Sequence, residues 1–71
     1  MNRFTDRQKK IIKEIHNSNT FITGKSLSLI LNVSLRTIQS EVSAINKVLH
    51  LILSTNRGYK IDDNLYKTMD F

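Results

Sequence analysis

The stretch that decides the fold runs from Ile22 to Val42 and reads ITGKSLSLILNVSLRTIQSEV. Three of its apolar residues follow the i, i+3, i+4 spacing of one helix face, namely Leu27, Ile30 and Leu31. This spacing predicts a helix over residues 24–31, with Thr23 as the N-cap whose hydroxyl accepts a backbone N–H. Asn32 is expected to end the helix, because asparagine adopts the left-handed conformation more readily than most other residues.

A second helix is predicted after a turn of only a few residues. Val33 is expected to enter the core, and Ser34 to cap a helix over residues 35–50. At 100° per residue, four apolar side chains of this helix share one narrow stripe, namely Ile38, Val42, Ile45 and Leu49. The opposite stripe is polar and free of acids, and consists of Arg36, Ser40, Ser43 and Lys47, with Gln39 at its edge. Two helices joined in this way are typical of a helix-turn-helix.

The segment before this stretch predicts one more helix, over residues 6–17. Thr5 and Gln8 have the spacing of a capping box. The apolar stripe that follows consists of Ile11, Ile12 and Ile15. Asn17-Ser18-Asn19 is a run of turn-forming residues that ends the pattern. Phe21-Ile22 is a short apolar pair, for which we expect a minimal edge strand.

The segment after the stretch predicts a β-hairpin with strands at residues 51–54 and 59–61. The connection over residues 55–58 contains Asn56 and Gly58, which suit turn conformations at positive φ. The expected fold class is therefore mainly α with a small β-hairpin, a three-helix winged helix-turn-helix spanning residues 1–61. Residues 62–71 are expected to form an acidic tail or the start of a linker to a regulatory region. A short helix packing back is the alternative for this segment, which contains Leu65, Tyr66, Met69 and Phe71.

The charge is distributed unevenly along the 71 residues, whose formal total is +5. Up to Lys60, ten Lys and Arg residues stand against three carboxylates, a balance of +7, whereas residues 61–71 have a balance of −2. A basic surface on a small domain indicates a polyanionic partner. The chain has no apolar run of the roughly 20 residues that a membrane span needs, and its N-terminus lacks the apolar region of a secretory signal. We therefore expect a cytoplasmic protein that does not bind membranes.

Catalysis is not indicated by the sequence. A chain of this length buries only about 60% of its unfolded surface, which leaves little room for a deep cleft. There is no cysteine, and His16 and His50 have no further ligand at metal spacing, so we expect both to be exposed or capping residues. No Ser/His/Asp set, glycine-rich phosphate loop or carboxylate pair can be assembled. The expectation is a domain with no enzymatic activity, metal, cofactor or small-molecule ligand.

Several motifs resemble the N-terminal domain of one group of bacterial regulators. The motifs are Val33-Ser34, Arg36-Thr37-Ile38, Glu41-Val42 and Gly58-Tyr59-Lys60-Ile61. The group is the PRD-containing sugar-operon regulators controlled by the phosphotransferase system, of the mannitol and lichenan activator type, and the resemblance covers about residues 4–61. The motifs are shared with winged-helix repressors of the DeoR and biotin-repressor kind. The resemblance implies a transcription regulator that binds double-stranded DNA. It also implies that dimerising domains follow, so that this domain alone is a monomer and the full-length protein a homodimer.

The expected DNA contacts come from helix 35–50 and from the segments beside it. Base contacts are expected from Arg36, Gln39, Ser40 and Ser43, since arginine fits guanine and glutamine fits adenine in the major groove. Backbone contacts are expected at a helix N-terminus, along helix 35–50 and on the hairpin, from Thr23, Lys25, Thr37, Lys47, Asn56, Arg57 and Lys60. Leu35 is expected to pack at the edge of the core, with a thymine-methyl contact as the alternative.

Four positions depart from the resembled pattern. Ser28 replaces a small alanine, so its hydroxyl should bond back to a helix carbonyl, and Leu29 lies outside the apolar stripe where relatives often carry a charge. Leu35 and Ser40 occupy positions that are frequently basic. These departures leave open a second interpretation, a winged helix that binds a protein instead of DNA. RNA binding is disfavoured, because the antiterminators of sugar systems begin with a β-rich domain.

Overall fold

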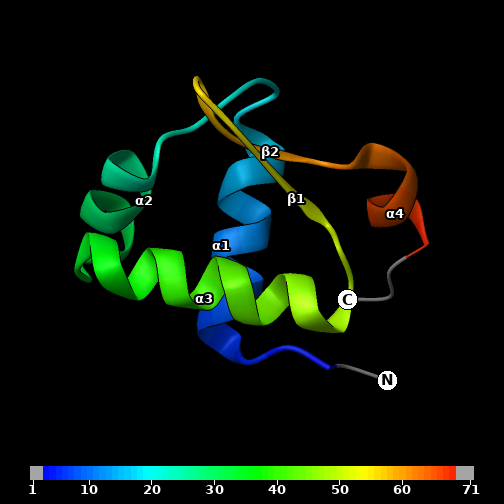
Figure 1. The fold of residues 1–71 in the computed structure, drawn as a ribbon, viewed down its shortest axis with the longest axis horizontal. Helices are drawn as coiled ribbons and strands as arrows, with labels where there is room; N and C mark the ends of the chain where they lie inside the picture. The colour runs from blue at the N-terminus through cyan, green and yellow to red at the C-terminus, as the bar shows by residue number, and fades with distance from the viewer. Residues whose placement is uncertain (1–2, 69–71) are drawn as a thin grey trace.

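The computed structural model of the chain describes residues 3–68. Its elements are α1 (Asp6–Asn17), α2 (Gly24–Leu31), α3 (Leu35–Val48), β1 (Ile52–Thr55), β2 (Gly58–Ile61) and α4 (Asp63–Lys67). Helix α3 crosses in front of α1, and α2 lies beside the N-terminal end of α3. The hairpin crosses over the C-terminal end of α1 (Figure 1). This mainly helical arrangement with one two-stranded hairpin confirms the predicted fold class.

Each of the first three helices begins where a hydroxyl group caps it. The Gln8 N–H donates to Thr5 Oγ1 at 3.1 Å, and the Gln8 side chain accepts from the Thr5 N–H at 3.0 Å, which completes the predicted capping box. Thr23 and Ser34 cap α2 and α3 in the same manner. Asn32 ends α2 in the left-handed conformation, with φ 56° and ψ 48°. These local predictions are confirmed.

Aliphatic side chains from α1, α2, α3 and the hairpin region form a single core. The buried residues are Ile11, Ile12, Ile15, Leu27, Ile38, Val42, Ile45, Leu51, Ile52 and Ile61. Within residues 3–68 no polar or charged residue is buried. Each fully buried aliphatic side chain contributes about 1.5–3 kcal/mol, so this core is the main source of stability. None of the described helices has the length and apolarity needed to cross a bilayer.

The predicted core differs from the observed one at three positions. Ile30 is 54% exposed, because the short helix α2 buries only Leu27 of its apolar stripe. Leu49 is half-buried and extended, with φ −151° and ψ 124°, because α3 ends at Val48 rather than at residue 50. Leu51, which is not part of the predicted stripe, is fully buried.

The end of α3 and the start of the hairpin are held together by Asn46. Its Oδ1 accepts from the N–H groups of Leu51 at 3.1 Å and Ile52 at 2.9 Å, and its Nδ2 donates to the Ile52 carbonyl at 3.0 Å. One side chain therefore satisfies three backbone groups where the chain leaves the helix. This contact fixes β1 at Ile52–Thr55, one residue later than predicted.

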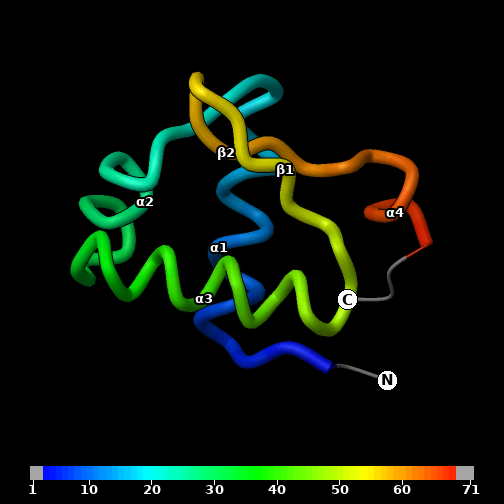
Figure 2. Tube along the Cα trace, in the orientation of Figure 1, coloured from blue at the N-terminus to red at the C-terminus, as the bar shows by residue number. Residues whose placement is uncertain are grey.

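The hairpin is antiparallel, with Ile52 opposite Ile61 and Thr55 opposite Gly58. The two-residue loop Asn56-Arg57 forms its tip, which lies close to the segment that precedes α2 (Figure 2). The expected edge strand is reduced to one bridge, in which Ile22 and Tyr59 exchange N–H···O bonds of 3.0 and 2.7 Å. This bridge fastens the hairpin to the helix-turn-helix.

Positive φ in the hairpin occurs at Gly58, at 125°, and Asn56 does not share it. A Cβ atom at Gly58 would lie 2.6 Å from the Ile22 carbonyl oxygen. Glycine is therefore required both by its backbone conformation and by the close approach of the Ile22 segment.

Helix α4 follows the hairpin and packs back on α1. Asp62 caps it, and the Tyr66 ring stacks on His16 with ring centroids 3.8 Å apart and an interplanar angle of 10°. His16 is therefore half-buried in a stack, and the expectation of an exposed or capping histidine was wrong. Leu65 also packs partly against the core. The remaining apolar residues of this segment, Met69 and Phe71, lie outside the described residues.

Candidate nucleic-acid interface

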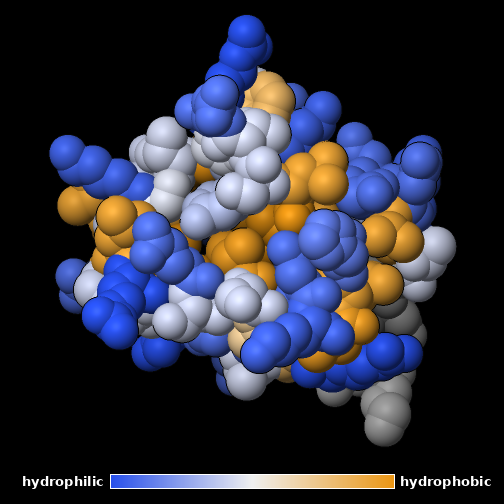
Figure 3. All heavy atoms as spheres, in the orientation of Figure 1, coloured by the Kyte–Doolittle hydropathy of each residue, from blue (hydrophilic) through white to orange (hydrophobic). Residues whose placement is uncertain are grey.

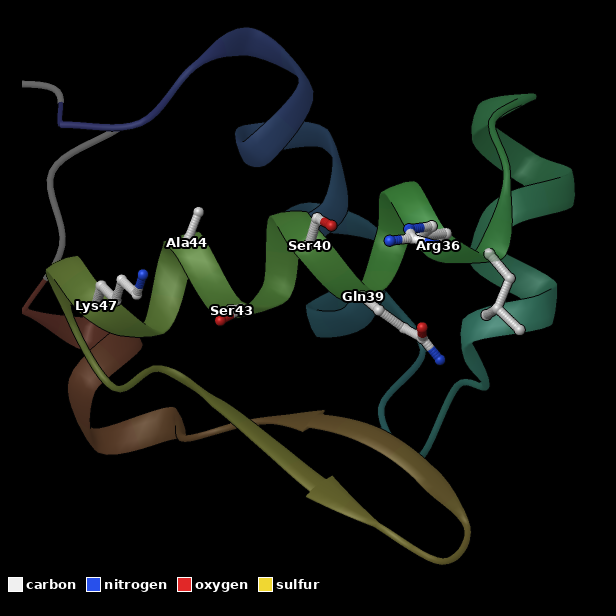
Figure 4. A pocket seen from close by; sticks show the side chains of 7 residues that line it. Arg36, Gln39, Ser40, Ser43, Ala44 and Lys47 are labelled. Carbon is white, nitrogen blue, oxygen red and sulfur yellow. The ribbon is translucent and has the colours of Figure 1, made fainter.

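One exposed face of α3 gathers the predicted base-contacting residues. A shallow surface depression is lined by Leu35, Arg36, Gln39, Ser40, Ser43, Ala44 and Lys47 (Figure 4). The structure thus brings together all five polar residues that the helical stripe had identified. Ala44 and Leu35 complete the face. The spacing of Ala44 from Arg36 and Ser40 was a signal for it that the sequence analysis missed.

The side chains on this face are short in the middle of the helix and long at its two ends. Ser40, Ser43 and Ala44 have short side chains, whereas Arg36 and Lys47 project at opposite ends of the helix (Figure 4). Short central side chains allow the helix backbone to approach base edges closely in a groove about 12 Å wide. The shape of the face therefore suits an inserted helix.

The acid of α3 is kept away from this face. Glu41 Oε1 accepts from Gln8 Nε2 at 3.2 Å, and Glu41 Oε2 lies 3.8 Å from Arg7 Nη1; the Glu41 side chain is 19% exposed. Arg36 forms no ion pair within residues 3–68, so it is not paired with Glu41 of the same helix. A free guanidinium can bind a phosphate or a base without first breaking an internal contact.

The N-terminus of α2 combines ordinary capping with free cationic charge. The Thr23 hydroxyl accepts from the Ser26 N–H and donates to Ser26 Oγ at 3.0 Å, so the cap is satisfied internally. Lys25 is exposed in the first turn, which contains no acidic residue. At the start of α3, the Thr37 hydroxyl lies 3.0 Å from Ser34 Oγ. Both threonines are therefore engaged in caps, while Lys25 remains available.

The hairpin presents two cations beside the ring of Phe21, which the sequence had indicated only as part of an edge strand. Arg57 Cζ lies 6.0 Å and Lys60 Nζ 5.8 Å from the centroid of Phe21. Asn56 and Arg57 are exposed at the tip. Attraction between a cation and the face of an aromatic ring holds long side chains in place. Both positive charges of the hairpin are therefore close to the Phe21 ring.

Apolar surface also remains uncovered on the helices. Leu29 is 74% exposed, as the stripe predicted, and Ile30 adds to it. The space-filling view shows apolar atoms over α2 and between α3 and the hairpin, set among hydrophilic side chains (Figure 3).

The Ser28 hydroxyl donates to the Lys25 carbonyl at 2.6 Å, which confirms the expected local bond.

Leu35 differs from its prediction. Leu35 was expected to pack at the edge of the core. Its side chain is instead 46% exposed and lines the depression on α3. One of its methyl groups lies against Gly24 at the start of α2, while the rest of the side chain faces solvent. Among residues 3–68 there is no group of three His, Cys, Asp or Glu side chains arranged to hold a metal ion.

Helices α2 and α3, joined by residues 32–34, and the hairpin that follows define a winged helix-turn-helix. Residues 7–60 match the family described as HTH domain, and the chain therefore belongs to the helix-turn-helix family. This membership supports DNA binding in a transcription regulator, and the family is not typically catalytic. Searches of the curated proteins and of the solved structures return no match.

Proposed function

We propose that this domain binds double-stranded DNA sequence-specifically, with α3 in the major groove and the hairpin against the neighbouring backbone or minor groove. The observation that carries the proposal is the acid-free face of α3 on a domain of the helix-turn-helix family. Arg36 and Gln39 are the main base-reading residues of the proposal, and Ser40 and Ser43 contact bases over the low middle of the face. The first turns of α3 are the part that reaches deepest in helix-turn-helix complexes.

The proposed backbone contacts surround the α3 face. They comprise Thr23, Lys25, Thr37, Lys47, Asn56, Arg57 and Lys60. Phe21 supports this role for the hairpin, because it keeps Arg57 and Lys60 together. Each phosphate neutralised by a cation releases counterions, so these contacts should make binding strongly dependent on salt.

The finer part of the proposal concerns the whole protein. The VSxRTI motif and the Gly58-Tyr59 hairpin support a bacterial, cytoplasmic regulator of a sugar operon, of the phosphotransferase-controlled PRD type. In this proposal the domain carries no enzymatic activity, metal, cofactor or small-molecule ligand. It is a monomer alone, because Leu29 and Ile30 offer far less than the roughly 1,200 Å² of a stable interface, and the full-length protein is a homodimer.

A salt titration with labelled duplexes tests DNA binding. The affinity should fall with increasing salt, with a log–log slope of about 0.9 for each phosphate contact. Arg36→Ala and Gln39→Ala should each cost about 1–3 kcal/mol on the preferred site and relax base preference. Arg57→Ala and Lys25→Ala should weaken binding to all sequences alike. Lys67→Ala is the matched control, since it removes one positive charge from α4, outside the proposed interface.

Equal losses on preferred and random DNA for the two α3 variants would show that α3 does not read bases. Absence of binding to any duplex at low salt would favour the second candidate, a protein-binding winged helix. The observation that favours this candidate is the pair of exposed residues Leu29 and Ile30 on α2. Sedimentation equilibrium tests the monomer, and a tight dimer dissociated by Leu29→Glu would make α2 an interface.

A further inference from the structure

Leu35 is an apolar side chain at the deepest-reaching end of a face that is otherwise polar or small. It is the first residue of α3, is 46% exposed, and lines the same depression as Arg36 and Gln39. The exposed apolar surface of this leucine is unfavourable in water. It would gain from an apolar group on whatever molecule the face binds.

The Leu35 side chain packs against the start of α2, which restrains its position. A Cβ atom at Gly24 would lie 2.8 Å from Leu35 Cδ1 and 3.3 Å from Tyr59 Cε2. The leucine methyl group therefore occupies space that opens only because residue 24 has no side chain. The Leu35 methyl is held against the start of α2 and does not need to be ordered by the ligand.

Gln39, which neighbours Leu35 on the same edge of the helix, indicates which group of the DNA Leu35 contacts. Leu35 and Gln39 are four residues apart, so their Cβ atoms are about 5–6 Å apart, and consecutive bases are about 3.4 Å apart along a strand. The two side chains therefore address bases within two base pairs of each other. Among the base edges in the major groove, thymine alone offers an apolar group, its C5-methyl, and glutamine matches adenine.

We propose that Leu35 reads the C5-methyl group of a thymine that lies within two base pairs of the adenine bound by Gln39. This inference rests on the proposed function, because it assigns base specificity to the same α3 face. It makes Leu35 a specificity-determining residue, and Gly24 a positioning residue that leaves room for it.

The test removes the methyl group alone. A preferred duplex is first selected from random sequences, and each thymine in it is then replaced in turn by deoxyuridine, which keeps the pairing and lacks the methyl. Loss of one buried methyl contact weakens binding about fourfold. We expect this loss at one thymine with the wild-type domain, no such loss with Leu35→Ala, and a retained loss with Leu35→Met, which keeps the apolar reach.

Val48→Ala is the matched control, because Val48 is a 40% exposed apolar residue of α3 that does not line the depression. It should keep the wild-type sensitivity to deoxyuridine. Gly24→Ala should displace the leucine methyl and reduce the deoxyuridine effect at the same thymine, with folding monitored by circular dichroism. An undiminished effect in Gly24→Ala would overturn the positioning role.

The thymine contact is overturned if the selected duplex binds specifically but Leu35→Ala shows the same deoxyuridine losses as the wild type. A different result, in which no duplex is selected at all, overturns the proposed function and the thymine contact together. Replacement of the critical thymine pair by 5-methylcytosine·guanine is a further check. It should bind more tightly than cytosine·guanine only if the methyl group is what Leu35 recognises.

Discussion

Replacing Asn46 by alanine removes three hydrogen bonds at the junction between α3 and the hairpin. The lost partners are the N–H groups of Leu51 and Ile52 and the carbonyl of Ile52. Each bond contributes about 1 kcal/mol net, and the higher helix propensity of alanine returns about 0.5 kcal/mol. Asn46 is half-buried, so water can replace part of the loss, and the expected decrease in unfolding free energy is about 2 kcal/mol.

Thermal and urea unfolding followed by circular dichroism measure this decrease. For a domain of this size, 1 kcal/mol corresponds to about 4–8 °C, so Asn46→Ala should lower Tm by about 8–16 °C. Asn46→Asp keeps the accepting oxygens but loses the donation to Ile52, and it places a negative charge in the last turn of a helix. We expect it to lose about 1 kcal/mol, between alanine and wild type.

Lys47→Ala provides the control for any substitution in the last turn of α3. Lys47 is exposed, and its replacement should change stability by less than about 0.5 kcal/mol. If Asn46→Ala is as stable as this control, the three bonds do not hold the hairpin to α3, and the reasoning is refuted.

Three further predictions concern contacts that the structure places outside the core. Gly58→Ala should lower the free energy of unfolding by about 2 kcal/mol in thermal unfolding, because it forces an L-residue to φ 125° and brings Cβ within 2.6 Å of the Ile22 carbonyl oxygen. A loss below about 0.5 kcal/mol would contradict this. Phe21→Leu should weaken DNA binding about two- to fivefold without changing the fold, since the hairpin cations lose an attraction of about 0.5–1 kcal/mol; unchanged affinity in a duplex titration would argue against it. Tyr66→Ala should lower stability by about 1 kcal/mol through loss of the His16 stack, whereas Tyr66→Phe should retain it; equal unfolding midpoints for the two variants would contradict the stack.

The parts of the fold that depend on neighbours three or four residues apart could be predicted from the sequence. Thr5, Thr23 and Ser34 cap their helices through bonds to residues three positions on, so the signal and its target lie in the same short window. The left-handed conformation of Asn32 is local in the same sense. The exposed polar stripe of α3 was also visible, because helical periodicity alone fixes which side chains share a face.

The parts that depend on packing between distant segments could not be predicted. Ile30 belongs to an apolar stripe by spacing, yet no described element covers it, and spacing does not report what lies opposite a helix. Asn46 was not identified from the sequence, because its partners at Leu51 and Ile52 lie beyond the end of α3 and are positioned only once the chain turns into β1. Phe21 and Leu35 have contacts set by the hairpin and by Gly24, which are close only after folding.

The bridge between Ile22 and Tyr59 has a consequence for the shape of the DNA. It ties the hairpin to the segment that begins α2, so the separation between the hairpin tip and α3 is set before any ligand arrives. A duplex must then bend or change its groove width to fit this fixed separation. The free-energy cost of that deformation depends on the DNA sequence, even at base pairs that no side chain contacts. We therefore expect preferred operators to favour easily deformed pyrimidine–purine steps between the bases read by α3 and the backbone held by the hairpin.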